Sequence, residues 1–230
     1  MAVSVVGTAS GADTSPATTT VTFSPAPTAG NLLIAAFGHA TYNGQSMSAP
    51  GGWTALDPDA TTYSGYAAFY RIAADATAAF DFTEAGGADV VGWVCIELTG
   101  QAASDYINNA AATARPQTDT ATFTTNSSTP SVLGCFALAF CATDGGVEDG
   151  QSVTGVTSGW TEGVNGTSNF HGCTIATRNS ATSDTTTGIT CAFTCANSDY
   201  GVTALYLIAP AASSDLSAAV SELVHARSTF

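Results

Sequence analysis

Lysine is absent from the 230 residues, and the arginines number only four, Arg71, Arg115, Arg178 and Arg227. The 18 acidic side chains give a formal net charge of −14, and no cluster of cations could follow a phosphate backbone. We therefore predict that the protein binds neither nucleic acid nor an anionic membrane surface. The missing lysine also excludes Schiff-base chemistry, a phosphate-loop lysine and lysine isopeptide cross-links.

Long apolar runs are missing as well. The longest, VLGCFALAFCA at 132–142, is much shorter than the roughly 20 residues that a membrane-spanning helix needs. Residues 1–20 contain neither a basic leader nor an apolar stretch of the length found in signal peptides. We expect the protein to be made and kept in a cytoplasm, or to be released from it by lysis or assembly.

Sequence motifs of catalysis are also lacking. The chain has no G-x-S-x-G elbow, no G-x-G-x-x-G loop and no phosphate loop, and His39, His171 and His225 stand apart from one another. These absences favour a protein that is not an enzyme and that carries no cofactor.

Six cysteines, at positions 95, 135, 141, 173, 191 and 195, include no C-x-x-C pair. This spacing disfavours a zinc or redox motif. Cysteines of the same predicted strand are too far apart to form a disulfide with each other. Cross-strand disulfides stay open among 15 full pairings, but buried thiols are the simpler interpretation.

Short segments rich in Thr, Val, Phe, Tyr and Ile alternate with Gly, Pro, Asn and Asp, which is typical of strands joined by turns. The predicted strands are 18–23, 31–37, 65–72, 78–83, 88–98, 119–124, 131–141, 170–177, 187–194 and 200–208. The protein is thus predicted to be all-β.

The chain also contains a degenerate duplication. TVTF at 20–23 matches TATF at 120–123, GWTAL at 52–56 matches GWTEG at 159–163, and VCIEL at 94–98 matches ALYLI at 204–208. We predict a two-sheet antiparallel β-sandwich, jelly-roll-like or lectin-like, over 18–210, with halves 18–99 and 119–210 and a crossover 100–118. We expect each half to supply one sheet, because neither could bury its own sheet well. Residues 1–17 are predicted to form an N-terminal arm.

Residues 211–230 differ in character. Apolar side chains recur there at helical spacing after a Ser-Ser-Asp cap, which predicts a short amphipathic helix with the apolar positions Leu216, Val220, Leu223 and Val224. The helix could be a lid on its own sandwich or a docking arm for a partner.

Two weaker binding sites are worth naming. Asp144, Glu148 and Asp149 place carboxylates among glycines, which Ca²⁺ favours, although a solvated hairpin tip explains them better. Tyr63 and Tyr66 could stack on a glycan, or could alternate between core and edge positions. Trp53 and Trp160 follow glycine at matching places of the two halves, which favours packing.

The order of segments resembles a β-sandwich module of tailed-bacteriophage virion proteins. The resemblance rests on AGNLLIAAF, APGGWTAL, YAAFYRIA, FDFT, VGWVCIELTG, SGWTEG and VTALYLIAP, and it covers roughly residues 18–210. It implies a non-enzymatic virion component, such as a capsid decoration (cement) protein that bridges capsomers and contacts the major capsid protein and copies of itself. A compact domain with a short terminal arm fits decoration better than a long fibre.

Two alternatives belong to other functional classes. The first is a tail or fibre adsorption subunit, or a carbohydrate-binding module, that recognises host-surface glycan through exposed aromatic side chains. The second, a glycoside hydrolase, needs two carboxylates across a groove, for which Glu84, Asp89 and Glu97 are the nominal residues.

Overall fold

The structure is a computed structural model that describes residues 2–13, 17–39, 46–57, 65–85, 90–108, 115–144, 152–167, 171–178 and 187–212. Within these ranges the regular elements are all β-strands, which confirms the all-β prediction. No helix in this part of the chain has the length and apolarity to cross a membrane. The predicted C-terminal helix falls within 213–230, outside the described residues.

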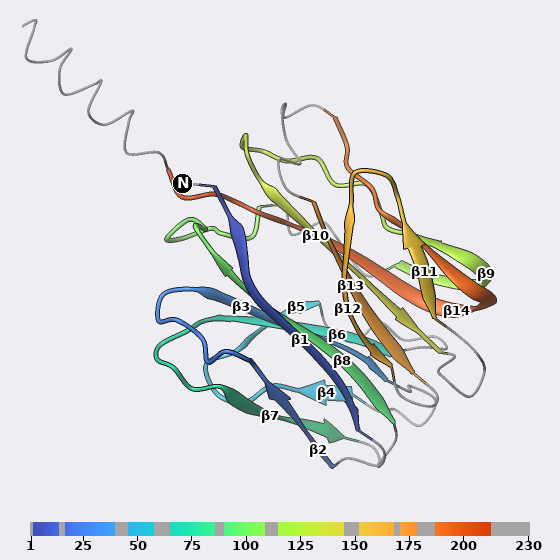
Figure 1. Cartoon of the computed structure of the whole chain (residues 1–230), viewed down its shortest axis with the longest axis horizontal. Coiled ribbons are helices and arrows are strands. Elements are labelled where there is room, and N and C mark those ends of the chain that lie inside the picture. The colour runs from blue at the N-terminus through green and yellow to red at the C-terminus, as the bar shows by residue number, and fades with distance from the viewer. Residues whose placement is uncertain are drawn as a thin grey trace, which may run out of the picture.

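The first half of the chain forms two antiparallel sheets (Figure 1). A five-stranded sheet has the order β1-β8-β3-β6-β5, and a three-stranded sheet has the order β2-β7-β4. The strand bounds are β1 (Ser4–Asp13), β2 (Thr18–Thr22), β3 (Leu32–His39), β4 (Ser46–Ser48), β5 (Thr54–Asp57), β6 (Gly65–Ile72), β7 (Ala79–Ala85) and β8 (Val91–Thr99).

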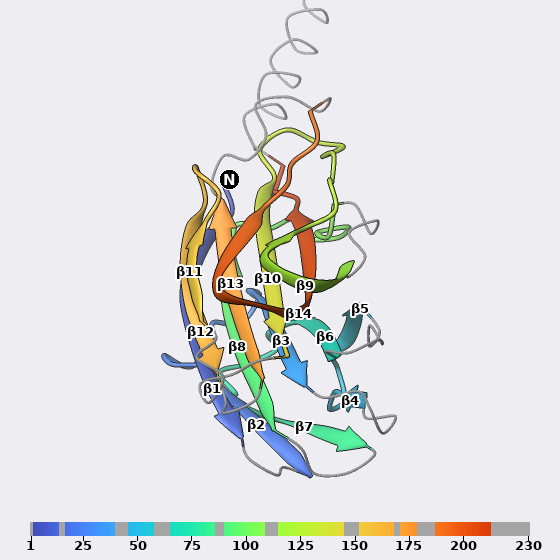
Figure 2. The same ribbon diagram turned by 90° about the vertical axis from the view of Figure 1, so that its right-hand side faces the viewer.

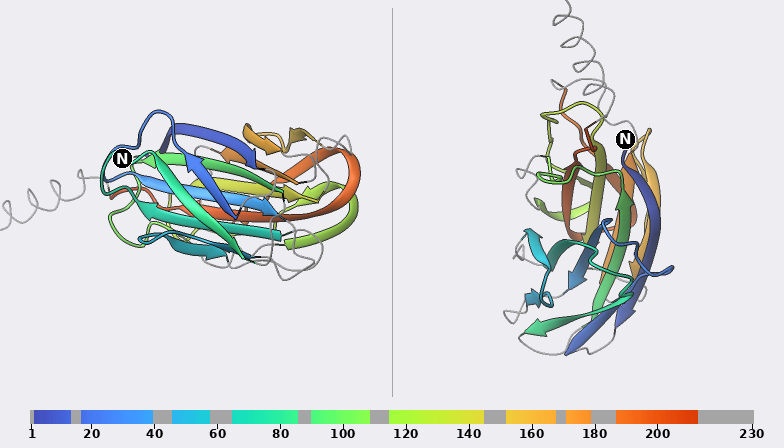
Figure 3. Two further views of the ribbon diagram at one scale, coloured as in Figure 1. Left: turned by 90° about the horizontal axis from the view of Figure 1, so that it is seen from below. Right: turned by 90° about the vertical axis from the view of Figure 1, so that its left-hand side faces the viewer.

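The second half forms one strongly curved sheet. Its order is β11-β14-β10-β13-β12, and β9 pairs with β14. The bounds are β9 (Arg115–Thr124), β10 (Phe136–Thr143), β11 (Val153–Val156), β12 (Thr161–Thr167), β13 (Gly172–Arg178) and β14 (Ala192–Ile208). The pairing of β14 with β9 shifts in register between Thr194 and Gly201, where β14 bends (Figure 3). The first part of β14 pairs with β11 and its second part pairs with β10, so one strand serves two layers.

The predicted duplication is confirmed by the strand pairing. The order β8-β3-β6-β5 is repeated as β14-β10-β13-β12, and β2-β7-β4 is repeated as β9, the first part of β14, and β11. The registers agree too, since Leu32 faces Leu98 as Phe136 faces Ile208. Even the turns correspond, because Gly52 and Gly159 precede the two tryptophans with the same φ of 86°.

The sandwich prediction holds, but the layers are assigned differently. Each half contains its own pair of layers, and the halves then pack against each other through their larger sheets (Figure 2). The five-stranded sheet is therefore covered on both faces. Its Leu33, Ala35 and Phe37 face the three-stranded sheet, while Leu32, Ile34 and Ala36 face the second half. The expectation that each half supplies a single sheet was wrong, but a half does not bury its larger sheet alone, because β3, β8 and β10 are apolar on both faces and one face is covered by the other half.

The predicted N-terminal arm is instead part of the body. Residues 4–13 form β1, which pairs with β8 along its whole length. In the second half the crossover takes the corresponding place, because Ile107 bridges to Ile208 and residues 115–117 pair with residues 201–203 of β14. The duplicated unit therefore includes an edge strand that the sequence comparison had left out.

Glycines line the junction of the two halves. A Cβ atom on Gly92 of β8 would collide with the Gly166 carbonyl oxygen, and one on Gly38 of β3 would collide with the Gly172 carbonyl oxygen. Tyr66 and Tyr206 also meet across the junction, with their hydroxyl oxygens 3.3 Å apart. The backbones of the halves thus approach more closely than any larger side chain would allow.

Candidate functional site

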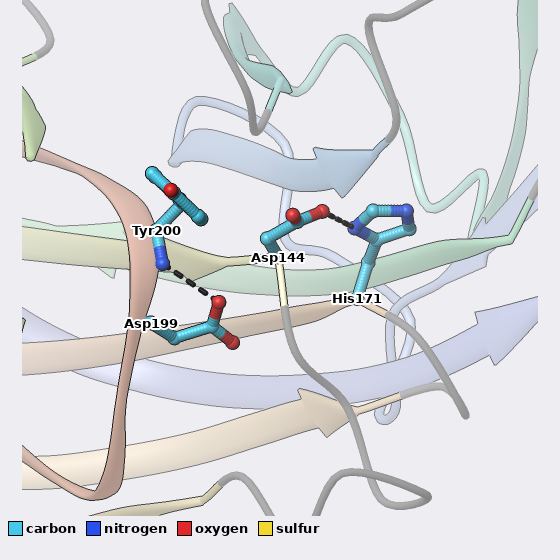
Figure 4. A network of polar contacts seen from close by, with 4 residues as sticks. All are labelled: Asp144, His171, Asp199 and Tyr200. Atoms are coloured by element: carbon cyan, nitrogen blue, oxygen red, sulfur yellow. Dashed lines mark hydrogen bonds and ion pairs between the residues drawn. The ribbon is translucent and has the colours of Figure 1, made fainter. Parts of the chain in front are cut away.

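Of the three residues predicted to bind Ca²⁺, the structure describes Asp144. Asp144 directly follows β10, and its Oδ1 lies 3.5 Å from Nδ1 of His171, which precedes β13 (Figure 4). The Asp144 backbone N–H donates to the carbonyl oxygen of Tyr200 at the bend of β14. Glu148 and Asp149 lie outside the described residues.

This network joins the end of β10, the start of β13 and the bend of β14. His171 is buried, and its carbonyl oxygen lies against Gly92 of the first half. Asp199 accepts a hydrogen bond of 2.7 Å from the Tyr200 N–H, which supports the bend. In the described part of the chain, no three His, Cys, Asp or Glu side chains are placed to hold a metal ion. The geometry describes a structural brace between β10, β13 and β14.

One of the two tyrosines predicted to stack on a glycan is buried. Tyr66 is fully buried in β6, its ring 6.2 Å from that of Phe140 in the second half. It cannot stack on a sugar, because the second half covers this face of the sheet. Tyr63 lies outside the described residues.

The two tryptophans pack as their recurrence predicted. Trp160 is buried, and its Nε1 donates to the Thr190 carbonyl oxygen over 3.1 Å. Trp53 is partly buried against Phe80 and Phe82, with ring centroids 5.3 and 5.1 Å away.

Arg71 is a site residue that the sequence did not reveal. Its guanidinium carbon lies 4.9 Å from the ring centroid of Phe80 and 5.9 Å from that of Trp53. These distances are those of cation–π contacts. The only signal in the sequence was an arginine in an otherwise apolar strand. One of the four cations is therefore used in packing.

The nominal hydrolase carboxylates do not form an open pair in the described structure. Glu97 is buried, and its Oε1 accepts hydrogen bonds from the Thr28 N–H and from Asn31 Nδ2, over 2.8 and 2.6 Å. Glu84 is buried in β7 of the three-stranded sheet. Asp89 lies outside the described residues. Glu97 thus anchors the loop that precedes β3.

All six cysteines are buried thiols, as the sequence favoured. Burial raises the pKa of Cys95 and Cys191 to about 12 and that of Cys135 to about 11. Two thiols are paired: Cys141 of β10 and Cys195 of β14 are hydrogen-bonded to each other. This hydrogen bond lowers the pKa of Cys195, whereas burial raises that of Cys141.

The two ends of the described chain lie together at one end of the molecule (Figure 1). The Ala211 N–H donates to the Gly100 carbonyl oxygen over 2.7 Å, and Gly100 also lies against the backbone of Ala2. Gly134 lies against Pro210, so the turn before β10 belongs to the same end. Large apolar side chains are exposed on β1 and on this turn: Val5 and Val6 at 41%, Val132 at 42% and Leu133 at 61%.

We call these four residues the apolar end patch. The predicted docking residues Leu216, Val220, Leu223 and Val224 lie outside the described residues, in the segment that follows Ala212. The patch lies at the same end of the molecule as Pro210 and Ala211, near the last described residue.

Comparison of the chain with models of known protein families, with curated proteins and with solved structures found no match. The fold by itself defines the class: an all-β protein built from two duplicated, tightly joined sandwiches.

Proposed function

We propose that the protein is a non-enzymatic virion subunit of a tailed bacteriophage, most specifically a capsid decoration protein that binds the major capsid protein and neighbouring copies of itself. The observation that carries the proposal is the apolar end patch, which lies at the same end of the molecule as Pro210 and Ala211. A rigid double sandwich with its contact elements at one end is suited to stand on a lattice.

The chemistry of the surface supports docking through apolar area. Only four arginines are available in the chain, and Arg71 already packs on Trp53 and Phe80. Ion pairs can therefore contribute little to a large interface. Exposed Val and Leu side chains supply the apolar centre that stable interfaces need.

The thiols are consistent with assembly inside a host. Six buried cysteines without a disulfide suit a protein that folds in a reducing cytoplasm before lysis. The adsorption or glycan-binding alternative loses Tyr66 as a stacking residue, so it enters here as an outcome of the test.

The test is to locate the chain in purified particles of the phage whose genome encodes it. Quantitative mass spectrometry would give its copy number relative to the major capsid protein, and cryo-electron microscopy would give its position. Copies in proportion to the capsid subunits, on the outer surface of the shell, are expected. A few copies at the tail would overturn decoration in favour of adsorption, and absence from the particles would overturn both.

The docking surface is tested with charge-matched variants. Leu133→Asp places a carboxylate in the apolar end patch, while Thr22→Asp places one on an exposed position of β2 in the three-stranded sheet. We expect Leu133→Asp, and deletion of 213–230, to reduce occupancy on capsids at least tenfold, with Thr22→Asp unchanged. Equal occupancy of all three proteins would refute this docking surface.

A further inference from the structure

One position that corresponds between the two halves carries different side chains. In each half this side chain points toward the opposite layer of the same half. Phe37 of β3 packs on Phe82 of β7, with ring centroids 4.7 Å apart, and so joins the two sheets of the first half. Leu32 and Phe136 begin β3 and β10 in the same register, so the residue of β10 that corresponds to Phe37 is Cys141. In the second half a thiol therefore faces the opposite layer where the first half has a phenyl ring.

The partner of this thiol belongs to the opposite layer. Phe140 contacts Tyr66 of the first half, so Cys141, the next residue in the strand, points to the other face of β10. Cys195 points inward from the first part of β14, since it is buried between the exposed Thr194 and Ala196. The two thiols are hydrogen-bonded and 1% and 4% exposed.

We propose that Cys141 and Cys195 are a modification site: an oxidisable dithiol that closes to an intramolecular disulfide between β10 and the first part of β14. The reactant is a small disulfide of the oxidised-glutathione class. The intramolecular disulfide would tie the two layers of the second half together covalently.

The reaction consists of two exchange steps. The Cys195 thiolate attacks one sulfur of the small disulfide, forming a mixed disulfide and releasing one thiolate. The Cys141 thiol then loses its proton and attacks the Cys195 sulfur, which releases the second small thiol. Two protein thiols are oxidised to one disulfide, and one small disulfide is reduced to two thiols.

Cys195 is the natural attacking residue. It directly precedes the exposed residues 196–198, and the ladder between β14 and β9 is irregular from Thr194 to Asp199. Local opening of this bend would expose Cys195 without unfolding the sheet. Its hydrogen bond from Cys141 favours the thiolate, which is the reactive form.

The other cysteines have different contacts, although Cys173 and Cys191 are close enough to Cys141 to raise its pKa beyond the effect of burial. Cys173 pairs in register with Ala142 and therefore faces the first half together with Phe140. The Cys135 thiol donates to the Val132 carbonyl oxygen, and the Cys191 thiol donates to that of Ala192. Cys95 lies in β8 of the first half.

Peptide mapping tests the proposal on the whole folded chain. The protein is incubated with oxidised glutathione, its remaining thiols are blocked, and it is denatured and digested with trypsin without reduction. Cleavage after Arg71, Arg178 and Arg227 places Cys141 in peptide 72–178 and Cys195 in peptide 179–227, because Arg115 precedes a proline. We expect these peptides to be linked, two of the six thiols to be lost, and fragmentation to place the bond at Cys141 and Cys195.

Variants sharpen the assignment. Cys141→Ala and Cys195→Ala should each abolish the link, whereas Cys191→Ala, from the same peptide as Cys195, should retain it. No link in the wild-type chain, or a link that persists in Cys195→Ala, would overturn the proposal. Fragmentation of the linked wild-type peptides gives the same decision if a variant fails to fold. A second readout is the unfolding temperature, which should rise on oxidation of the wild-type chain and return with dithiothreitol.

Discussion

At the scale of single residues, buried polar groups hold loops to the sandwich. Glu97 is 1% exposed and accepts two hydrogen bonds through one oxygen, from Thr28 and Asn31. A carboxylate is tolerated at this depth because donors from the loop before β3 replace water.

Glu97→Ala should destabilise the protein by roughly 1–3 kcal/mol, because it leaves the buried Asn31 amide and the part-buried Thr28 N–H without their acceptor. Glu97→Gln is the matched control, since its carbonyl oxygen can still accept both hydrogen bonds. Urea unfolding of the three proteins provides the comparison. Equal midpoints for Glu97→Ala and the wild type would mean that water satisfies the loop instead.

The buried thiols predict a loss of stability at alkaline pH. The pKa of Cys95 and Cys191 is raised from 9.0 to about 12. Above pH 9 the unfolded chain loses these protons while the folded chain keeps them, so folding becomes less favourable. Each such thiol lowers the free energy of unfolding by about 1.4 kcal/mol per pH unit between its two pKa values.

We therefore expect the unfolding temperature under reducing conditions to be insensitive to these thiols below pH 9 and to fall from pH 9 to pH 10.5. Cys95→Ala should reduce the steepness of this fall, measured by calorimetry at each pH. An unchanged slope in that variant would contradict the assignment to Cys95.

At the scale of elements, β8 meets β12 and β13 through glycines. A Cβ atom on Gly166 of β12 would collide with the carbonyl oxygens of Trp93 and Gly11, neither of which can rotate away as a side chain would. A Cβ atom on Gly155 of β11 would meet no other atom within 4 Å.

Gly166→Ala should thus cost about 1–3 kcal/mol of stability, because it wedges the halves apart. Gly155→Ala should be nearly neutral. Urea unfolding measures the difference in stability between the two variants. Equal stabilities would show that the backbones at the junction can move apart to admit a Cβ atom.

At the scale of the whole molecule, the larger sheets of the two halves share one core. Leu32, Ile34 and Leu98 of the first half belong to the same buried cluster as Phe136, Leu138 and Ile208 of the second. Neither half can lose its partner without exposing this face to water. The molecule should therefore unfold as a unit.

We expect calorimetry to give a single transition in which the van't Hoff and calorimetric enthalpies agree. Phe140→Ala should lower the stability of the entire molecule by about 3–5 kcal/mol, since Phe140 contacts Tyr66 and Tyr206. Two separate transitions, with only one moved by Phe140→Ala, would show that the halves fold independently.

The sequence by itself determined what depends on local pattern. Alternating apolar residues, turn glycines and the repeated Gly-Trp pair were enough to predict an all-β fold, the duplication and the packing of Trp53 and Trp160. These features follow from strand periodicity and turn chemistry, which act over a few residues.

Only the tertiary structure decided which face of each strand is covered, and by what. The alternation in GYAAFYRI could not show that the second half buries Tyr66. Spacing could neither bring the Cys141 and Cys195 thiols together nor assign residues 4–13 to a sheet edge. The sequence of a strand that is apolar on both faces does not show which segments will cover it. The hydrophobic effect is non-directional, and the covering segments are far away in the chain.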